Sequence, residues 1–128
     1  ISCWGTGEFQ QYDVSDPFNP KLTGSVHLGG IVRKAPHPSQ PATALNGGPQ
    51  MVEVSRDGRR VYFTNSLYIP WDEQFYPEGI KSWMVKLNAA PDGGIEIDRD
   101  FFLETQGHRS HQVRLEGGDA SSDSYCYS

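Results

Sequence analysis

The sequence predicts an all-β fold in which short antiparallel strands are arranged as blades of a β-propeller. Glycine and proline are frequent, with 14 Gly and 9 Pro among 128 residues, which favours many short elements joined by turns over long helices. Several short runs alternate apolar and polar side chains, which is the period of a β-strand. Two of these runs flank an Asp-Gly turn that follows a serine, a pattern that recurs in propeller blades.

Residues 1–30 are expected to form part of one blade. They hold a short strand, a glycine turn at residues 5–7, a second strand over Glu8–Val14 and a third over residues 21–28. Pro17 follows the second strand and helps to end it, because proline cannot donate a hydrogen bond to a strand ladder. These three strands would make most of an antiparallel meander.

Residues 31–49 differ in character and are expected to form an irregular, extended connection. They contain four prolines and an Asn-Gly-Gly run, and both features disfavour regular structure. A connection of this length is unusual inside a compact domain, so it is either functional or wraps a surface.

Residues 50–106 are expected to supply a complete blade of about four strands. The expected strands alternate in character and are separated by glycine turns; they cover residues 50–55, 60–67, 82–88 and a run that begins with Ile95–Ile97. In the first of them, Val52 and Val54 are expected to share one face. Residues 66–81 are rich in aromatic side chains and are expected to form an irregular loop between the second and third strands.

Residues 107–128 are expected to form a C-terminal strand and a tail. His111–Gly117 alternates in character, and its strand would complete the first blade of the whole protein. A blade takes roughly 40–50 residues, so the chain would hold about two blades plus this tail. Two blades cannot close a ring, so the first partner expected is the remainder of the same propeller, its N-terminal blades.

Composition argues against two classes of partner. The net charge is −5 and no more than two basic residues are adjacent, which disfavours nucleic acid. No run approaches the roughly 20 apolar residues that a membrane-spanning helix needs. Ile1 lacks a preceding methionine and the first residues read as the middle of a strand, so a fragment of a longer protein is expected.

The two cysteines, Cys3 and Cys126, are expected to be free thiols, with a disulfide between the chain ends as the alternative. Cys126 is also a possible soft ligand for copper, although its place near the end favours a mobile residue. Asp119 and Asp123 could bind a metal, but turn formation is the expected role in a Gly-Gly-Asp-Ala-Ser-Ser-Asp run.

The four histidines give only a weak metal signal. His108 and His111 are three residues apart, and on a strand this spacing places the two side chains on opposite faces. His111 shares its face with apolar residues, so a buried, hydrogen-bonded histidine is the favoured interpretation and a metal ligand the alternative. His108 is expected in a solvated loop, and His27 and His37 at the surface.

Trp71 and Asp72 lie in the aromatic stretch together with Tyr76. One interpretation is a rim that shapes the mouth of a pocket, because loops on a rigid scaffold often carry function. The favoured alternative is a loop held by aromatic packing, in which Asp72 and Gln74 bond the backbone. No serine-histidine-aspartate spacing, phosphate loop or Cys-x-x-Cys motif is present, so a catalytic apparatus complete within these residues is not expected.

Several longer motifs make the chain resemble the selenium-binding protein family, whose members include the methanethiol oxidases. The most specific is Trp-Asp-Glu-Gln-Phe-Tyr-Pro at residues 71–77, together with Gly-Gly-Asp-Ala-Ser-Ser-Asp near the end. Less specific matches occur in the same order along the chain: residues 2–4, 11–17, 20–24, 47–51, 55–60 and 111–114.

The resemblance implies that the chain is the C-terminal part of a seven-bladed propeller. It also implies copper-dependent oxidation of methanethiol by O2 and water, which gives formaldehyde, hydrogen sulfide and hydrogen peroxide. His111 occupies the place where relatives carry a histidine in Ala-His-Glu-Leu-Arg-Tyr, so it is the expected metal ligand here, and the other ligands would lie upstream of Ile1. Trp71, Asp72 and Tyr76 would form part of the pocket or channel wall that limits access by larger thiols.

Two departures from the family pattern bear on location and function. Position 120 is Ala where animal and plant relatives have Cys, and the ending differs from theirs. The ending is more similar to that of the bacterial branch, whose members are exported, so a periplasmic location is expected. The competing functional class is a non-enzymatic propeller that acts as a binding scaffold, and a small or absent histidine set in the other blades would favour it.

Overall fold

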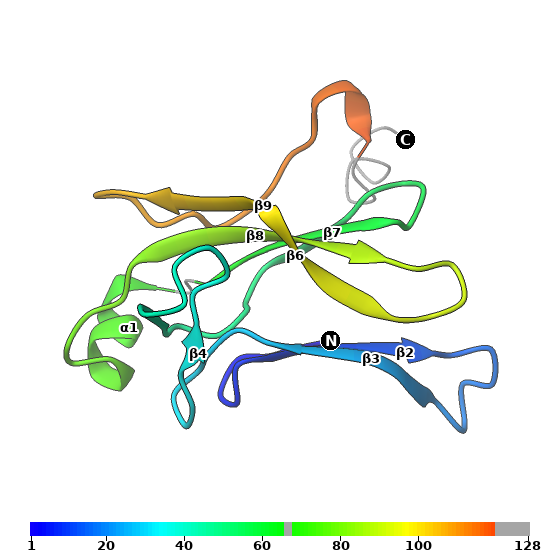
Figure 1. Cartoon of the computed structure of the whole chain (residues 1–128), viewed down its shortest axis with the longest axis horizontal. Helices are drawn as coiled ribbons and strands as arrows, with labels where there is room; N and C mark the ends of the chain where they lie inside the picture. The colour runs from blue at the N-terminus through cyan, green and yellow to red at the C-terminus, as the bar shows by residue number, and fades with distance from the viewer. Residues whose placement is uncertain (66–67, 120–128) are drawn as a thin grey trace.

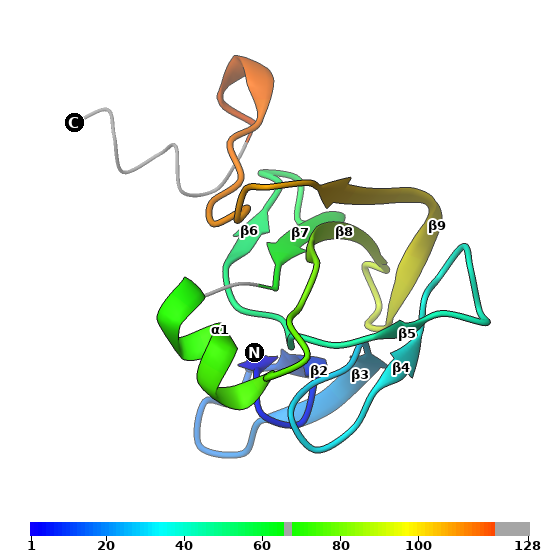
Figure 2. The ribbon, with the colours of Figure 1, turned by 90° about the vertical axis from the view of Figure 1, so that its left-hand side faces the viewer.

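The computed structural model describes residues 1–65 and 68–119, which form two larger β-sheets that face each other, a separate two-stranded pair and one short helix. The two sheets are stacked in Figure 1, and Figure 2 views them along their strands. The expectation of a mostly β-sheet protein is confirmed.

The first sheet contains three antiparallel strands in the order β1-β2-β3. Their bounds are β1 Ser2–Cys3, β2 Glu8–Asp13 and β3 Lys21–His27. The register of β2 on β3 shifts between Gln11 and Tyr12, which is a bulge in an otherwise regular ladder. The three strands predicted in residues 1–28 are therefore present.

The second sheet contains four antiparallel strands in the order β6-β7-β8-β9. Their bounds are β6 Val52–Val54, β7 Arg60–Thr64, β8 Ser82–Ala89 and β9 Ile95–Thr105. The four strands predicted between residues 50 and 104 are present, and β9 is much longer than its Ile95–Ile97 signal. Its later residues do not alternate in character, because β9 pairs only with β8 in the described part of the chain and its side chains are mostly exposed or half-buried.

The hydrophobic core lies between the two sheets. The first sheet and the residue after it contribute Phe9 and Leu28, and Phe9 stacks on Phe63 of the second sheet with ring centroids 5.1 Å apart. Most of the core comes from alternate residues of β7 and β8: Val61, Phe63, Trp83, Val85 and Leu87. The period-two signal in residues 82–88 therefore identified the core face correctly.

The sheets also touch directly where the β8–β9 turn meets β2 and β3. The side-chain oxygen of Gln11 accepts hydrogen bonds from the Gly94 amide, at 2.7 Å, and from the Thr23 hydroxyl, at 3.0 Å. Gly24 lies so close to the turn that a Cβ there would be 2.8 Å from the backbone nitrogen of Ile95. A side chain at position 24 would force the sheets apart.

The strap, which is our name for residues 31–49, runs along one side of both sheets (Figure 2). It is mostly irregular, as expected, but it contains a small antiparallel pair, β4 Ala35–Pro36 with β5 Ala44–Leu45. Leu45 is buried in the main core.

One sequence-based expectation about local structure is wrong. The aromatic stretch holds a helix, α1 Ile69–Phe75, because proline is tolerated at a helix start, where its missing N–H needs no partner. Residues 111–115 pair with no strand among the described residues, so the expected C-terminal strand, which would pair in another blade, stays a prediction. Only a 3₁₀ turn, Glu116–Gly118, follows.

Strand β6 agrees with the expectation that Val52 and Val54 share one face, and Val54 packs against the core. Val52 is still 39% exposed, whereas Glu53 on the opposite face is buried with 4% exposure. Both faces of β6 are therefore partly covered in the described structure. No helix among the described residues is long and apolar enough to cross a membrane.

Candidate functional site

The candidate site lies at the end of the four-stranded sheet where β7 and β9 finish and β8 begins. We name residues His108–His111 the histidine segment, and it follows β9 after a short bend. Helix α1 stands at the same end of the molecule, and the chain from β7 to β8 passes through it (Figure 2).

Short polar side chains fix the backbone of the histidine segment. The Thr105 hydroxyl donates to the His108 carbonyl at 3.1 Å, and the Ser110 amide donates to the Ser82 hydroxyl at 2.8 Å. The Thr64 hydroxyl, at the end of β7, donates to the His111 carbonyl at 3.0 Å. Thr64 and Ser82 are buried, so the bonds that these two residues make are partly shielded from competing water.

A buried ion pair connects the segment to α1. Asp72 is 1% exposed, and its Oδ2 lies 3.5 Å from Nε of Arg109. The same guanidinium donates from Nη1 to the Ile80 carbonyl at 2.7 Å. The sequence did not single out Arg109, which is found only once Asp72 is seen to be buried, because a buried carboxylate requires a partner.

The other face of α1 carries aromatic residues. Trp71 is 50% exposed and lies near Tyr68, which is 60% exposed, with ring centroids 6.4 Å apart. Tyr76, just after the helix, is buried and its hydroxyl accepts a hydrogen bond from the Gly48 amide. Burial raises the pKa of the Tyr76 phenol above its ordinary value.

A groove of about 470 Å³ lies between α1 and the end of β9. Its lining combines apolar and charged side chains, among them Ile69, Ile80, Lys81, Glu104, His108 and Arg109. Ile69 comes from α1 and the last two from the histidine segment, so the separation between helix and segment sets the width of the groove.

The predicted site residues therefore do not form one wall. Trp71 faces outward, Asp72 faces Arg109, and Tyr76 packs near Trp4, with ring centroids 6.3 Å apart. His111 is exposed in the described structure, so the favoured interpretation of a buried histidine is wrong, and the physical reason is that its stretch has no strand partner there. His108 is exposed, as expected for a loop.

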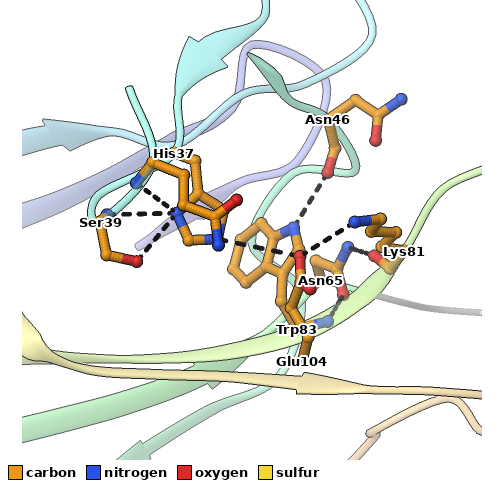
Figure 3. A network of polar contacts seen from close by, with 8 residues as sticks. His37, Ser39, Asn46, Asn65, Lys81, Trp83 and Glu104 are labelled. Atoms are coloured by element: carbon orange, nitrogen blue, oxygen red, sulfur yellow. Dashed lines mark hydrogen bonds and ion pairs between the residues drawn. The ribbon is translucent and has the colours of Figure 1, made fainter. Parts of the chain in front are cut away.

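His37 is also a correction, because it is buried with 4% exposure instead of lying at the surface. Its Nδ1 accepts hydrogen bonds from the Ser39 and Gln40 amides, and its ring packs on Phe102. Figure 3 shows that His37 belongs to a polar network in which its Nε2 lies 3.8 Å from Glu104. Its Nδ1 therefore holds the strap's own turn, and its Nε2 attaches the strap to β9.

The same network fixes the strap to β8 through Trp83, and Asn65 holds the start of β8 (Figure 3). The indole Nε1 of Trp83 donates to the Asn46 carbonyl at 3.1 Å. Asn65 is fully buried and accepts from the Trp83 amide while donating to the Lys81 carbonyl, each at 2.8 Å. The expected surface residue His27 is half-buried, with Nδ1 2.9 Å from the Gly7 carbonyl.

Metal donors are sparse in this part of the chain. Residues 1–65 and 68–119 contain no group of three or more His, Cys, Asp or Glu side chains that could hold a metal ion. Asp119 pairs with Arg60 and accepts from the Arg56 amide, which is a turn-stabilising role. Cys3 is a free, half-buried thiol; Asp123 and Cys126 lie outside the described residues.

The fold and the site define a mostly β-sheet protein in which His108 and His111 lie beside the Asp72–Arg109 ion pair at one end of the larger sheet. The model of the 56 kDa selenium-binding protein family matches residues 1–126, and the chain belongs to this family. The match covers nearly the whole chain, in agreement with the motifs at residues 71–77 and 117–123.

The chain is similar to relatives with two kinds of name. It is 40% identical to a methanethiol oxidase of Xenopus tropicalis and 41% identical to one of Homo sapiens, in each case over 96% of this chain and 31% of the relative. It is 39% identical to selenium-binding protein 3 of Arabidopsis thaliana, over 95% of this chain and 30% of the relative. The chain thus spans about a third of the length of these relatives.

A solved structure agrees with this family membership. The crystal structure of a hypothetical selenium-binding protein from Sulfolobus tokodaii superposes with a TM-score of 0.88 at 66% identity. The superposition covers 99% of this chain and 28% of the other.

Proposed function

We propose that this chain is part of a copper-dependent methanethiol oxidase. The reaction would convert methanethiol, O2 and water into formaldehyde, hydrogen sulfide and hydrogen peroxide. The observation that carries the proposal is the similarity, at about 40% identity over nearly all of the chain, to relatives named methanethiol oxidase.

In this proposal the two sheets are parts of two blades of a seven-bladed propeller, and the remaining blades are the first partner. The face-to-face packing of a four-stranded and a three-stranded antiparallel sheet is consistent with neighbouring blades. The exposed run at residues 111–112 is what we expect of a strand whose pairing partner lies in another blade.

Copper fits the described residues only in part. With no cluster of three donors in the described ranges, this part of the chain would not hold the ion alone, and it would contribute His111 to a site shared with other blades. His111 suits that role because its side chain is exposed while its backbone is fixed by Thr64. Bound copper would supply affinity for a thiolate sulfur and a route for electrons to O2.

The proposed wall residues would act in different ways. Trp71 is exposed and could contact a small thiol directly. Asp72 and Tyr76 are buried, so they would not contact the thiol and would act indirectly, by holding α1 in place. A Trp71→Ala variant with unchanged thiol preference would contradict the role of Trp71.

The first test is the copper content of the full-length protein and of its His111→Ala variant, measured by elemental analysis. His108→Ala is the matched control, because His108 is also exposed and lies in the same segment. We expect copper in the parent and in the control, and loss of copper in His111→Ala, together with equal yields of formaldehyde and hydrogen sulfide from methanethiol in the parent.

Two other results would change the assignment. Copper retained in His111→Ala would remove His111 from the ligand set. A parent that binds no copper after reconstitution and consumes no methanethiol would favour the non-enzymatic binding scaffold, a role consistent with relatives named only selenium-binding protein. We also propose a periplasmic location, on the resemblance of the ending to the bacterial branch; recovery of the protein in the cytoplasmic fraction of its cells would contradict it.

A further inference from the structure

We propose that Asp72 is a positioning residue that, through Arg109, holds helix α1 and the histidine segment in one fixed arrangement. The link itself follows from the geometry of the described residues. Its consequence for metal binding rests on the proposed function, because only there does His111 act as a ligand.

The ion pair is placed where a carboxylate would otherwise be costly. Asp72 is 1% exposed, and a buried carboxylate is tolerated only when charge and hydrogen bonds compensate it. Arg109 provides the charge at 3.5 Å, and its Nη1 is bonded to the Ile80 carbonyl. Because a guanidinium is planar and rigid, these two contacts fix its position relative to both the helix and the start of β8.

The residues on either side of Arg109 are also held in place by hydrogen bonds. The His108 carbonyl is bonded by Thr105 of β9, and the Ser110 amide is bonded to Ser82 of β8. Each residue of the segment is therefore tied to a different element, and α1 is connected to this set through Asp72. A displacement of the helix would have to break the ion pair or move the segment with it.

Helix α1 depends on such contacts because its own stability is low. It has seven residues and no side-chain cap at its N-terminus, and isolated helices of this length are not stable in water. Its exposed residues include Ile69 and Trp71, so burial of its outer face contributes little. Asp72 is the buried residue within the helix.

The groove connects the Asp72–Arg109 ion pair to the proposed function. Ile69 of α1 lines one side, and His108 and Arg109 line the other. If Asp72 releases Arg109, the groove and His111, two residues further along, lose one of the contacts that fix them, while the bonds from Thr64 and Ser82 still hold this part of the segment. Asp72 would then influence copper binding without being a ligand.

The test compares Asp72→Asn with Asp98→Asn in the full-length protein, by hydrogen–deuterium exchange followed by mass spectrometry. Asp98 is a matched control because it forms a similar partly buried ion pair, with Lys86 at 2.6 Å, away from α1. We expect exchange to become at least about tenfold faster in Asp72→Asn, both in α1 and in residues 105–111, since loss of one partner from a buried pair is strongly destabilising. Asp98→Asn should leave both regions at the parent rate.

Several outcomes would overturn the inference. Faster exchange in α1 alone, or in neither region, would show that the helix and the segment are not linked through Asp72. Equal acceleration in Asp98→Asn would show a general loss of stability. Arg109→Gln provides a second variant: when it is combined with Asp72→Asn, the double variant should exchange no faster than the more affected single one, because the two residues form one interaction.

Copper affinity separates this inference from the proposed function. We expect Asp72→Asn to raise the copper dissociation constant about tenfold while Asp98→Asn leaves it unchanged. A parent that binds no copper would overturn the proposed function, and the exchange data would still decide the link. A parent that binds copper, with unchanged affinity and exchange in Asp72→Asn, would overturn the link and leave the proposed function intact.

Discussion

The interior of the four-stranded sheet and the histidine segment are fixed by different forces. In β7 and β8, Phe63, Trp83 and Val85 are almost fully buried, and their backbone groups pair with neighbouring strands. In the histidine segment the side chains are exposed or half-buried, and the backbone is held by hydroxyl groups and by one ion pair.

This difference indicates where a functional residue can be placed with little loss of folding stability. A residue in the sheet interior is constrained by packing on every side, so substitution there affects folding before it affects chemistry. The histidine segment can present imidazole groups to a partner because hydrogen bonds, and not side-chain packing, position its backbone. The following four experiments are ordered from the largest expected effect to the smallest.

The largest effect is expected for Trp83→Ala in the sheet interior. Trp83 is 1% exposed, and it also donates to the strap at Asn46. The variant should lose about 3–5 kcal/mol of unfolding free energy, the usual cost of removing a large aromatic side chain from a core. Urea denaturation of the full-length protein followed by circular dichroism measures this. Trp71→Ala, which removes a half-exposed indole, is the control and should cost less than about 1 kcal/mol; equal losses would contradict the comparison.

A smaller effect is expected for Asn65→Ala. Asn65 lies between the interior of the four-stranded sheet and the histidine segment. Its side chain joins the Lys81 carbonyl to the Trp83 amide within the buried network. The variant should lose about 2–3 kcal/mol, because it leaves buried polar groups without partners. Thermal unfolding is the measurement, and a variant as stable as the parent would indicate that water replaces the lost bonds. Asn88→Ala, at an exposed position of β8, is the control and should have little effect.

Thr64→Val tests the histidine segment alone. It keeps the shape of a fully buried side chain but removes the hydroxyl that donates to the His111 carbonyl. We expect a loss of about 1 kcal/mol, the typical net worth of one hydrogen bond. The stronger signature should be faster amide exchange in residues 108–113 with no change in β7 or β8. Uniform acceleration through the sheet would show that the segment and the sheet unfold together.

The smallest effect is expected from pH acting on Asp98. Its hydrogen bond to Lys86 holds the pKa of the Asp98 carboxyl below its usual value. Since the folded pKa is lowered, this contribution to stability is present above the unfolded value of about 3.9 and is lost as pH falls through the lower folded pKa. Asp98→Asn should therefore show a shallower loss of stability below about pH 4 than the parent. Identical pH profiles in thermal unfolding would exclude this contribution.

The sequence was informative where side chains repeat with a regular period. The alternation in residues 82–88 predicted a strand, and its apolar residues Val85 and Leu87 are indeed buried together, because pairing in β8 forces alternate residues to one side. The burial of Glu53 could not be predicted in this way, because it depends on tertiary surroundings that the alternation of β6 does not encode. The prediction of a surface position for His37, which lies between two prolines, was wrong because Phe102 covers the ring.

The candidate site was predicted only in outline. His111, Trp71, Asp72 and Tyr76 were singled out through the family resemblance, and their roles remain predictions. The link to Arg109 could not be predicted, because Asp72 and Arg109 are far apart in the chain and come together only when α1 packs beside the end of β9. Contacts of this kind follow from how elements meet, and periodicity within one element carries no information about them.

The strap has a consequence for the order in which the chain folds. Strands β2 and β3, and likewise β7, β8 and β9, are neighbours in the chain, so each sheet can form from local contacts. The strap is attached by His37 and Asn46, which reach residues of β9 and β8 that are synthesised much later. These contacts of the strap can therefore form only after the second sheet has formed. Until then its several prolines make the strap poor at pairing with strands of other molecules, which lowers the risk of aggregation during synthesis.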